Sequence, residues 1–137
     1  MSTRTFALVF GIAFLLVGAT GFIPGLLQPP HTHPDIAVDA FFGYSLGLFA
    51  VNILHSLVHL LFGVWGLIAY KSLSAAKTYA RGVAIIYAVL MVAGLIPGLN
   101  TMFGLVPLFG NDVWLHALLA AVAAYFGFIH RDTVIER

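Results

Sequence analysis

Three histidines in two apolar stretches are the residues best placed to do chemistry. His55 and His59 lie four positions apart, so on a helix their imidazoles share one face. Imidazoles spaced in this way hold zinc and similar divalent transition-metal ions. His116 stands in a second apolar stretch, and together with Asp112 it would complete a set of three or four ligands. The spacing predicts a divalent transition-metal site or, with opposed imidazoles, a haem b site.

The same histidines allow two other interpretations. As a buried polar network, they would hold helices together through hydrogen bonds to Asn52, Asp112 or backbone carbonyls. As titrating groups, they would sense protons or a ligand near neutral pH. Asn52 begins the first histidine-bearing stretch, Asn111 precedes the second, and both are the supporting polar residues of the site. In a cofactor site, three aromatic side chains are expected to line the pocket: Phe49, Phe62 and Trp114.

Long apolar stretches must position these residues. The chain has 137 residues, of which 61% are hydrophobic and 8% charged, whereas soluble proteins carry about 25% charged residues. A helix that crosses a bilayer core of about 30 Å needs about 17–25 mostly apolar residues. Four stretches qualify: 6–26, 52–70, 79–96 and 113–129. The sequence therefore predicts an all-α membrane protein, a single domain over residues 1–137 that forms a four-transmembrane-helix bundle.

Polar and small residues form one stripe on each histidine-bearing helix, because positions three, four, seven and eleven apart share a face. The first stripe is Asn52, His55, His59, Gly63 and Gly66, and the second is Asp112, His116, Ala120, Ala123 and Gly127. The opposite faces carry Ile53, Leu57, Leu60, Leu61, Leu118, Leu119 and Phe126. Polar groups avoid lipid and small residues let helices approach closely, so both stripes are predicted to face the bundle interior.

The basic residues predict an orientation. The six are Arg4, Lys71, Lys77, Arg81, Arg131 and Arg137. They fall at the two termini and between the second and third stretches, whereas the loops 27–51 and 97–112 have none. The positive-inside rule places both termini in the cytoplasm and the histidines near the outer surface. The net charge of +1 gives no reason to expect nucleic acid, and the lack of cysteine excludes thiolate ligands.

The chain also carries an internal repeat. Residues 21–26 resemble residues 94–99, and the Gly-Leu pair and asparagine of 47–52 recur within 104–111. This pattern predicts a duplicated helical hairpin whose halves are related by an axis along the membrane normal. The first outward loop is longer, and its apolar part, residues 39–51, is predicted to form an interfacial helix or a re-entrant lid over the histidines.

Two segments carry a family resemblance. Residues 52–63 read Asn-x-x-His-x-x-Val-His-Leu-x-x-Gly, and residues 111–116 read Asn-Asp-Val-Trp-Leu-His. Both resemble the signature of the domain of unknown function 4383 family of small four-helix bacterial membrane proteins. The resemblance implies a four-helix architecture, a location in the bacterial plasma (inner) membrane, and a shared polar motif at Asn52, His55, His59 and His116. It implies no activity or cofactor.

The sequence holds no complete catalytic set, so enzyme activity is not expected. It favours a small accessory or scaffold subunit, or a binding subunit, of unestablished activity. Its expected partners are the lipid bilayer and either a larger membrane complex or further copies of the chain. The alternative is a protein that binds a zinc- or copper-like ion, or haem b, through His55, His59 and His116. A further pair, His31 and His33, lies in a Pro-rich loop and is expected to be solvated.

Overall fold

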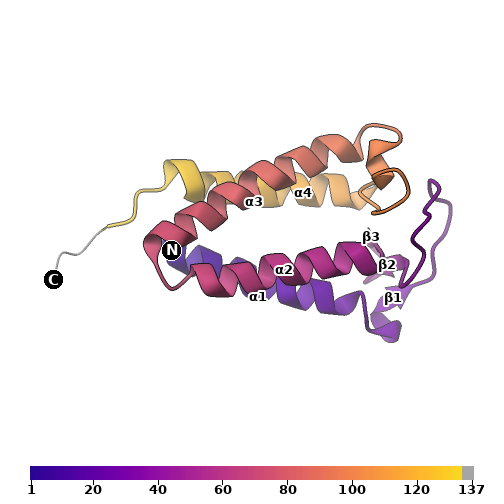
Figure 1. Ribbon diagram of the computed structural model, residues 1–137, viewed down its shortest axis with the longest axis horizontal. Coiled ribbons are helices and arrows are strands. Elements are labelled where there is room, and N and C mark those ends of the chain that lie inside the picture. Colours follow the sequence, from indigo (N-terminus) through magenta and orange to yellow (C-terminus); the bar gives the residue numbers. More distant parts are fainter. Residues whose placement is uncertain (134–137) are drawn as a thin grey trace.

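A computed structural model describes residues 1–133, in which four long helices form two antiparallel hairpins (Figure 1). The first hairpin pairs α1 with α2, and the second pairs α3 with α4, which continues as a π-helical turn, η3. The helices are α1 (Thr3–Thr20), α2 (Ile53–Ala69), α3 (Leu73–Gly94), α4 (Asn111–Ala124) and η3 (Tyr125–Ile129). The predicted four-helix architecture is confirmed.

Three of these helical segments are long and apolar enough to cross a membrane: α1, α3 and the continuous segment Asn111–Ile129. The fourth, α2, is apolar but has only 17 residues. Their outward faces are rich in large apolar side chains, among them Leu16, Leu61, Ile85, Val89, Leu118 and Phe128. An apolar exterior of this kind is compatible with a membrane protein.

Two helix boundaries differ from the predicted ones. α1 ends at Thr20 rather than near residue 26, because Pro24 lacks an N–H group and begins a short 3-10 turn, η1 (Pro24–Leu26). α3 begins earlier than residue 79, because the Ser72 side chain caps it by accepting a hydrogen bond from the Ala75 N–H. The first turns of α3 therefore lie in what was expected to be a loop.

The long loop between α1 and α2 is a small sheet rather than an interfacial helix, so that part of the prediction is wrong. Its antiparallel strands are β1 (Leu27–Gln28), β2 (Gly43–Ser45) and β3 (Phe49–Val51), in that order. Leu46 and Gly47 turn the chain between β2 and β3 with positive φ angles of 54° and 73°. A left-handed turn of this kind ends helix propagation and favours a hairpin. β3 lies beside the start of α2 and α4.

The core is formed where α1 crosses α3, and equivalent positions of the two helices are buried. Phe14 of α1 packs on Tyr87 of α3 with ring centroids 5.3 Å apart, and Phe6 lies 6.3 Å from Tyr79. The buried positions recur at one constant separation along the chain: Thr3 and Ala76, Phe6 and Tyr79, Ala7 and Ala80, Gly11 and Ala84, Phe14 and Tyr87, Gly21 and Gly94. The two hairpins therefore use their first helices in the same way.

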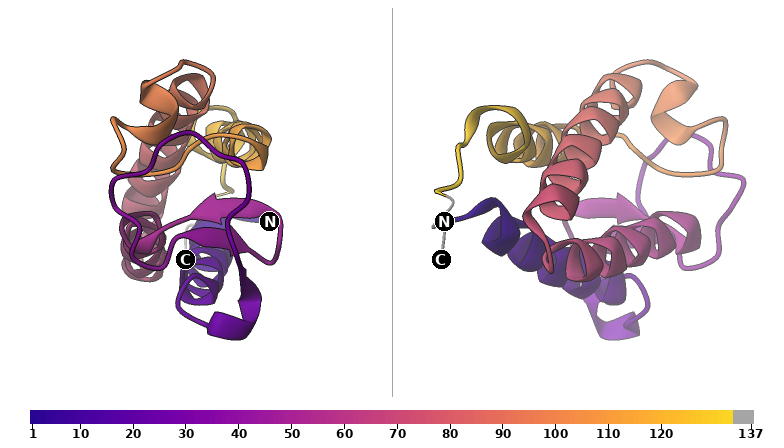
Figure 2. Two further views of the ribbon diagram at one scale, coloured as in Figure 1. Left: turned by 90° about the vertical axis from the view of Figure 1, so that its right-hand side faces the viewer. Right: turned by 60° about the vertical axis from the view of Figure 1, so that its left-hand side comes forward.

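The loops and the termini lie at opposite ends of the molecule. The described N-terminus and the α2–α3 turn share one end, while the strands and η2 (Leu99–Thr101) share the other (Figures 1 and 2). Arg4, Lys71, Lys77 and Arg131 therefore gather at the terminal end. Arg137, the remaining basic residue of the predicted inner side besides Arg81, lies outside the described residues.

Candidate metal centre

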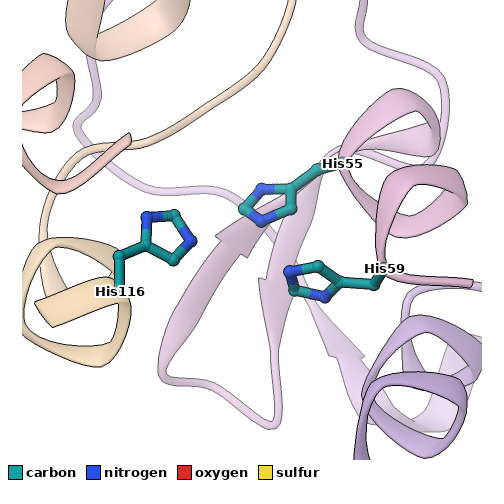
Figure 3. Close-up of side chains that lie close together, drawn as sticks. All are labelled: His55, His59 and His116. Atoms are coloured by element: carbon teal, nitrogen blue, oxygen red, sulfur yellow. The ribbon is translucent and has the colours of Figure 1, made fainter. Parts of the chain in front are cut away.

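The three predicted histidines meet in the bundle interior near its loop end. One ring nitrogen from each of His55, His59 and His116 lies within 4.8 Å of the other two. The His55 ring centroid is 4.6 Å from that of His59 and 6.0 Å from that of His116. Figure 3 shows the two imidazoles from α2 and the one from α4 directed toward a common space. The structure thus brings His116 close to His55, although the two residues are 61 positions apart in the sequence.

Local structure fixes where these imidazoles lie. Asn52 caps α2, because its side-chain oxygen accepts a hydrogen bond of 3.0 Å from the backbone N–H of His55. The cap places His55 in the first turn, and His59 follows one turn later on the same face. His116 lies in the second turn of α4. All three side chains are buried, with exposed fractions of 5% or less.

The imidazoles have ring nitrogens that no described residue satisfies. Nδ1 of His55, Nδ1 of His59, and both Nδ1 and Nε2 of His116 are buried without a hydrogen-bond partner within residues 1–133. The backbone carbonyls of Ala50 and Pro107 face the His55 ring. Most buried polar atoms in proteins are paired, and an unpaired one costs about 1–3 kcal/mol. Four such atoms on three neighbouring imidazoles leave the triad with donor and acceptor capacity that the described chain does not use.

A small cavity adjoins the histidines. Its volume is about 80 Å³, and apart from the three imidazoles it is lined by Val58, Tyr87, Leu90, Met102, Val106 and Leu108. Phe49, Phe62 and Trp114, the expected lining residues, do not line it; Trp114 instead donates to Asn111 at an exposed site. Pockets for drug-sized ligands are about 300–1,000 Å³, so this space suits a single ion better than a haem.

The distances are suited to a bound ion after a small adjustment. A tetrahedral ion with metal–nitrogen bonds of about 2.0–2.1 Å holds its ligand nitrogens about 3.4 Å apart. To bind one ion, the nitrogens of the triad, which lie within 4.8 Å of one another, would have to approach by about 1.4 Å at most. The arrangement can therefore present three neutral nitrogen ligands to one ion.

The two asparagines are structural. The Asn52 amide donates to the carbonyls of Val38 and Leu105 at 2.9 and 2.8 Å, so it ties the long loop and the second outward loop to α2. The Asn111 amide donates to the carbonyl of Leu48 at 3.0 Å. The two bonds are equivalent: each asparagine donates to the carbonyl of a leucine in the outward loop of the other hairpin, and each of these leucines directly follows a glycine. Their hydrogen bonds position the histidines without involving the imidazoles.

Asp112 does not join the triad. Its side chain is 2% exposed, one turn before His116 on α4, but its carboxylate is not among the ligand atoms that converge. Burial, together with the charge of the Asp112 carboxylate, raises the pKa of Tyr44 on β2. Its Oδ2 is buried and unpaired within the described chain. The predicted fourth ligand is therefore outside the group that the fold assembles.

The predicted inward stripes are buried along their whole length, with one departure on the opposite face. Phe126 was expected to face outward, yet it is 7% exposed and stacks on Phe6 with ring centroids 4.8 Å apart. The π-helical turn η3 explains this difference, because its wider turn brings both Phe126 and Gly127 to the inner face.

A second polar cluster, at the terminal end, was not anticipated. The Asp132 carboxylate accepts hydrogen bonds from the N–H and the hydroxyl of Thr3 at 2.7 and 2.6 Å, and lies 3.4 Å from the Lys77 ammonium. Lys77 also donates to the carbonyls of Phe126 and His130. Arg81 donates to the carbonyl of Gly127 at 2.9 Å. The sequence feature that could have predicted this cluster is the pair Lys77 and Arg81, one helical turn apart and without a nearby acidic residue. Such cations stabilise the C-terminal end of a helix.

The loop histidines do not approach the triad. His31 stacks on Tyr44 with ring centroids 4.1 Å apart, and Nδ1 of His33 lies 2.7 Å from the Pro34 carbonyl. Both are exposed, as predicted for solvated residues.

The fold and the site together define a class: a small protein of two helical hairpins with membrane-length apolar helices and a buried histidine triad at one end. The chain matches the family described as Domain of unknown function (DUF4383) over residues 4–129, and it belongs to that family. This finding confirms the resemblance carried by residues 52–63 and 111–116. Comparisons with curated proteins and with solved structures gave no match.

Proposed function

We propose that this protein is a multi-pass membrane protein that binds one transition-metal ion through His55, His59 and His116. The observation that carries the proposal is the convergence of three buried imidazoles, within 4.8 Å, whose ring nitrogens lack partners in residues 1–133. An ion would satisfy the lone pairs that the described protein leaves unsatisfied. A hydrogen-bonded core would need partners for the four nitrogens that stay unpaired within residues 1–133.

The membrane setting is part of the same proposal. The chain spans the bacterial plasma membrane four times, with both termini in the cytoplasm and the triad near the outer surface. Its support is the apolar exterior of the helices and the gathering of basic residues at the terminal end, away from the loops that carry none. Because the chain has no cysteine, single-cysteine labelling provides the test. An impermeant thiol reagent applied to intact cells is expected to label Thr32→Cys and to spare Ser74→Cys.

The duplicated hairpin is also part of the proposal. It is supported by the constant separation of buried positions on α1 and α3 and by the reciprocal bonds of Asn52 and Asn111 to the opposite loop. The two halves have diverged at the site, since one half supplies two histidines and the other supplies one. Duplication explains why one bundle can close a three-ligand site between two hairpins.

An accessory role in a larger complex is compatible with metal binding. An open groove on the outer face of α3, lined by Ala88, Val89, Val92, Ala93, Ile96 and Leu99, offers small and branched side chains to a neighbouring helix. A protein of this size would then carry the ion within, or deliver it to, such an assembly.

The metal proposal is tested by equilibrium dialysis of untagged protein in detergent against Zn²⁺, Co²⁺ and Cu⁺. The wild type is expected to retain one equivalent of at least one of these ions. His116→Ala is expected to weaken binding by about a hundredfold or more, since the binding energy of such sites, about 10–16 kcal/mol with four ligands, is shared among their ligands. His33→Ala, which alters an exposed loop imidazole, serves as the matched control and should bind as the wild type does. Retention of no ion by the wild type would overturn the proposal.

A further inference from the structure

Two side chains that line the histidine cavity besides the histidines carry a heteroatom, Tyr87 and Met102. Of the two, Met102 offers a soft sulfur donor. Met102 follows η2 in the second outward loop and lines the cavity together with the three imidazoles. It is also 41% exposed, so the same residue touches the outside and the interior. Its thioether sulfur is a soft, weakly basic ligand.

The backbone holds Met102 in an uncommon conformation. Met102 and Phe103 have φ angles of 45° and 57°, in the left-handed region that residues with a side chain rarely adopt. Hydrogen bonds hold this turn: the N–H of Met102 donates to the Leu99 carbonyl at 2.9 Å and that of Phe103 to the Gly98 carbonyl at 2.9 Å. Such conformations persist only where the surroundings impose them, and they cluster at functional sites.

The charge of the site bears on which ion it takes. The ligands that converge are neutral imidazoles, and the one carboxylate nearby, that of Asp112, lies outside the group. Met102 aside, the remaining lining is aliphatic except for Tyr87, whose neutral phenol adds no charge. The cost of burying an ion in a low-dielectric interior rises with the square of its charge, so a divalent ion without an anionic ligand costs about four times as much as a monovalent one. An enclosed donor set without an anionic ligand favours a monovalent ion, and a thioether among the donors favours a soft one.

We infer that the site takes Cu⁺, with the Met102 thioether as a fourth ligand beside the imidazoles of His55, His59 and His116. This inference rests on the proposed metal site and specifies its ion. Thioether and imidazole are ligands suited to Cu⁺, whereas Zn²⁺ in proteins is bound by imidazole, thiolate and carboxylate. Because Met102 is partly exposed, it is also the first ligand that an incoming ion meets from the loop end.

The test compares Cu⁺ and Zn²⁺ affinities of three untagged proteins in detergent, under anaerobic reducing conditions, by competition with chromophoric chelators. The wild type is expected to bind Cu⁺ at least a hundredfold more tightly than Zn²⁺. Met102→Leu is expected to weaken Cu⁺ binding about tenfold or more and to change Zn²⁺ binding less than threefold. Met91→Leu, a methionine of α3 outside the cavity, is the matched control and should change neither affinity.

X-ray absorption at the copper edge provides a readout that does not depend on stability. The wild type is expected to show a sulfur shell around copper that Met102→Leu lacks. A nitrogen-only shell in the wild type, or Cu⁺ affinity unaffected by Met102→Leu, would overturn the inference and leave the histidine site standing. Tighter binding of Zn²⁺ than of Cu⁺ would also overturn it. Failure of the wild type to bind either ion would instead overturn the proposed function.

Discussion

The two ends of the bundle differ in whether their polar side chains are paired by hydrogen bonds. At the terminal end, the Asp132 carboxylate is paired with Thr3 and Lys77, and the last carbonyls of η3 receive hydrogen bonds from Lys77 and Arg81. At the loop end, three imidazoles converge with four ring nitrogens unpaired within residues 1–133. The contrast separates polar groups that pair with one another across the fold from polar groups that, under the proposed function, are held in place for an ion.

The difference follows from which hydrogen-bond partners lie within reach of each side chain. Lys77 and Arg81 lie one turn apart on α3 and have long side chains, so they reach the free carbonyls at the end of the last helix. The imidazoles are short, and they face one another across an apolar cavity. The backbone carbonyls that face the His55 ring, those of Ala50 and Pro107, leave its Nδ1 without a partner.

The largest expected effect is the loss of the terminal cluster. Asp132→Ala leaves the Lys77 ammonium and the Thr3 N–H without their anion, so the free energy of unfolding is expected to fall by about 2–3 kcal/mol. Thermal unfolding in detergent measures the change. Asp35→Ala, at an exposed loop position, should stay within about 0.5 kcal/mol of the wild type. Equal stability of the Asp132 variant and the wild type would remove the contrast between the ends.

Replacing a histidine with leucine is expected to change the free energy of unfolding in opposite directions at the two ends. In the absence of metal, His116→Leu replaces a buried ring that has two unpaired nitrogens with an apolar side chain of similar size. Its stability is expected to match or exceed that of the wild type by about 1 kcal/mol. His130→Leu removes a partly exposed imidazole 3.6 Å from Asp132 and should cost up to about 1 kcal/mol. A large loss of stability in metal-free His116→Leu would favour the hydrogen-bonded network over the metal site.

The smallest expected effect is a pH dependence confined to the terminal end. Burial alone would raise the pKa of Asp132, but hydrogen bonds from Thr3 and Lys77 outweigh it and hold that pKa below its ordinary value of 3.8. The folded state therefore releases this proton more readily than the unfolded state. Asp132 contributes its stability above about pH 4 and loses it as the pH falls through the lowered pKa.

Melting temperatures measured from pH 6 to pH 3 test this expectation. The difference between the wild type and Asp132→Asn should be constant at the upper end and should shrink as the pH falls below about 4. A difference that is the same at pH 3 and at pH 6 would show that the carboxylate charge contributes nothing.

The sequence was sufficient for features that depend on helical period. Four helices, the burial of both stripes and the convergence of the histidines follow from where apolar, small and polar residues recur. It was insufficient for features that depend on contacts between distant segments. The strands of residues 27–51 form by pairing across a left-handed turn at Leu46 and Gly47, which the apolar composition of that loop conceals. The inward turn of Phe126 depends on one extra residue in a π-helical turn.

The candidate site was likewise predicted in part. The histidine triad could be predicted because helical spacing fixes direction. Asp112 appeared to be a ligand because it lies one turn from His116, but its carboxylate is not among the ligand atoms that converge, and helical spacing alone does not fix the distance between side chains of different helices. Met102 was missed because its place in the cavity depends on a strained loop with consecutive left-handed residues.

The central claim is that the unpaired imidazoles at the loop end are held in place for an ion, and one measurement tests it most directly. Metal-free wild type and His116→Leu are melted in detergent with and without Cu⁺ at about a hundred times the dissociation constant of the wild type. An ion that binds only the folded state at that excess contributes about 2.7 kcal/mol, which corresponds to a rise of roughly 5–10 °C in Tm. The account predicts this rise for the wild type and no rise for His116→Leu. An equal rise in both proteins, or none in either, would contradict it.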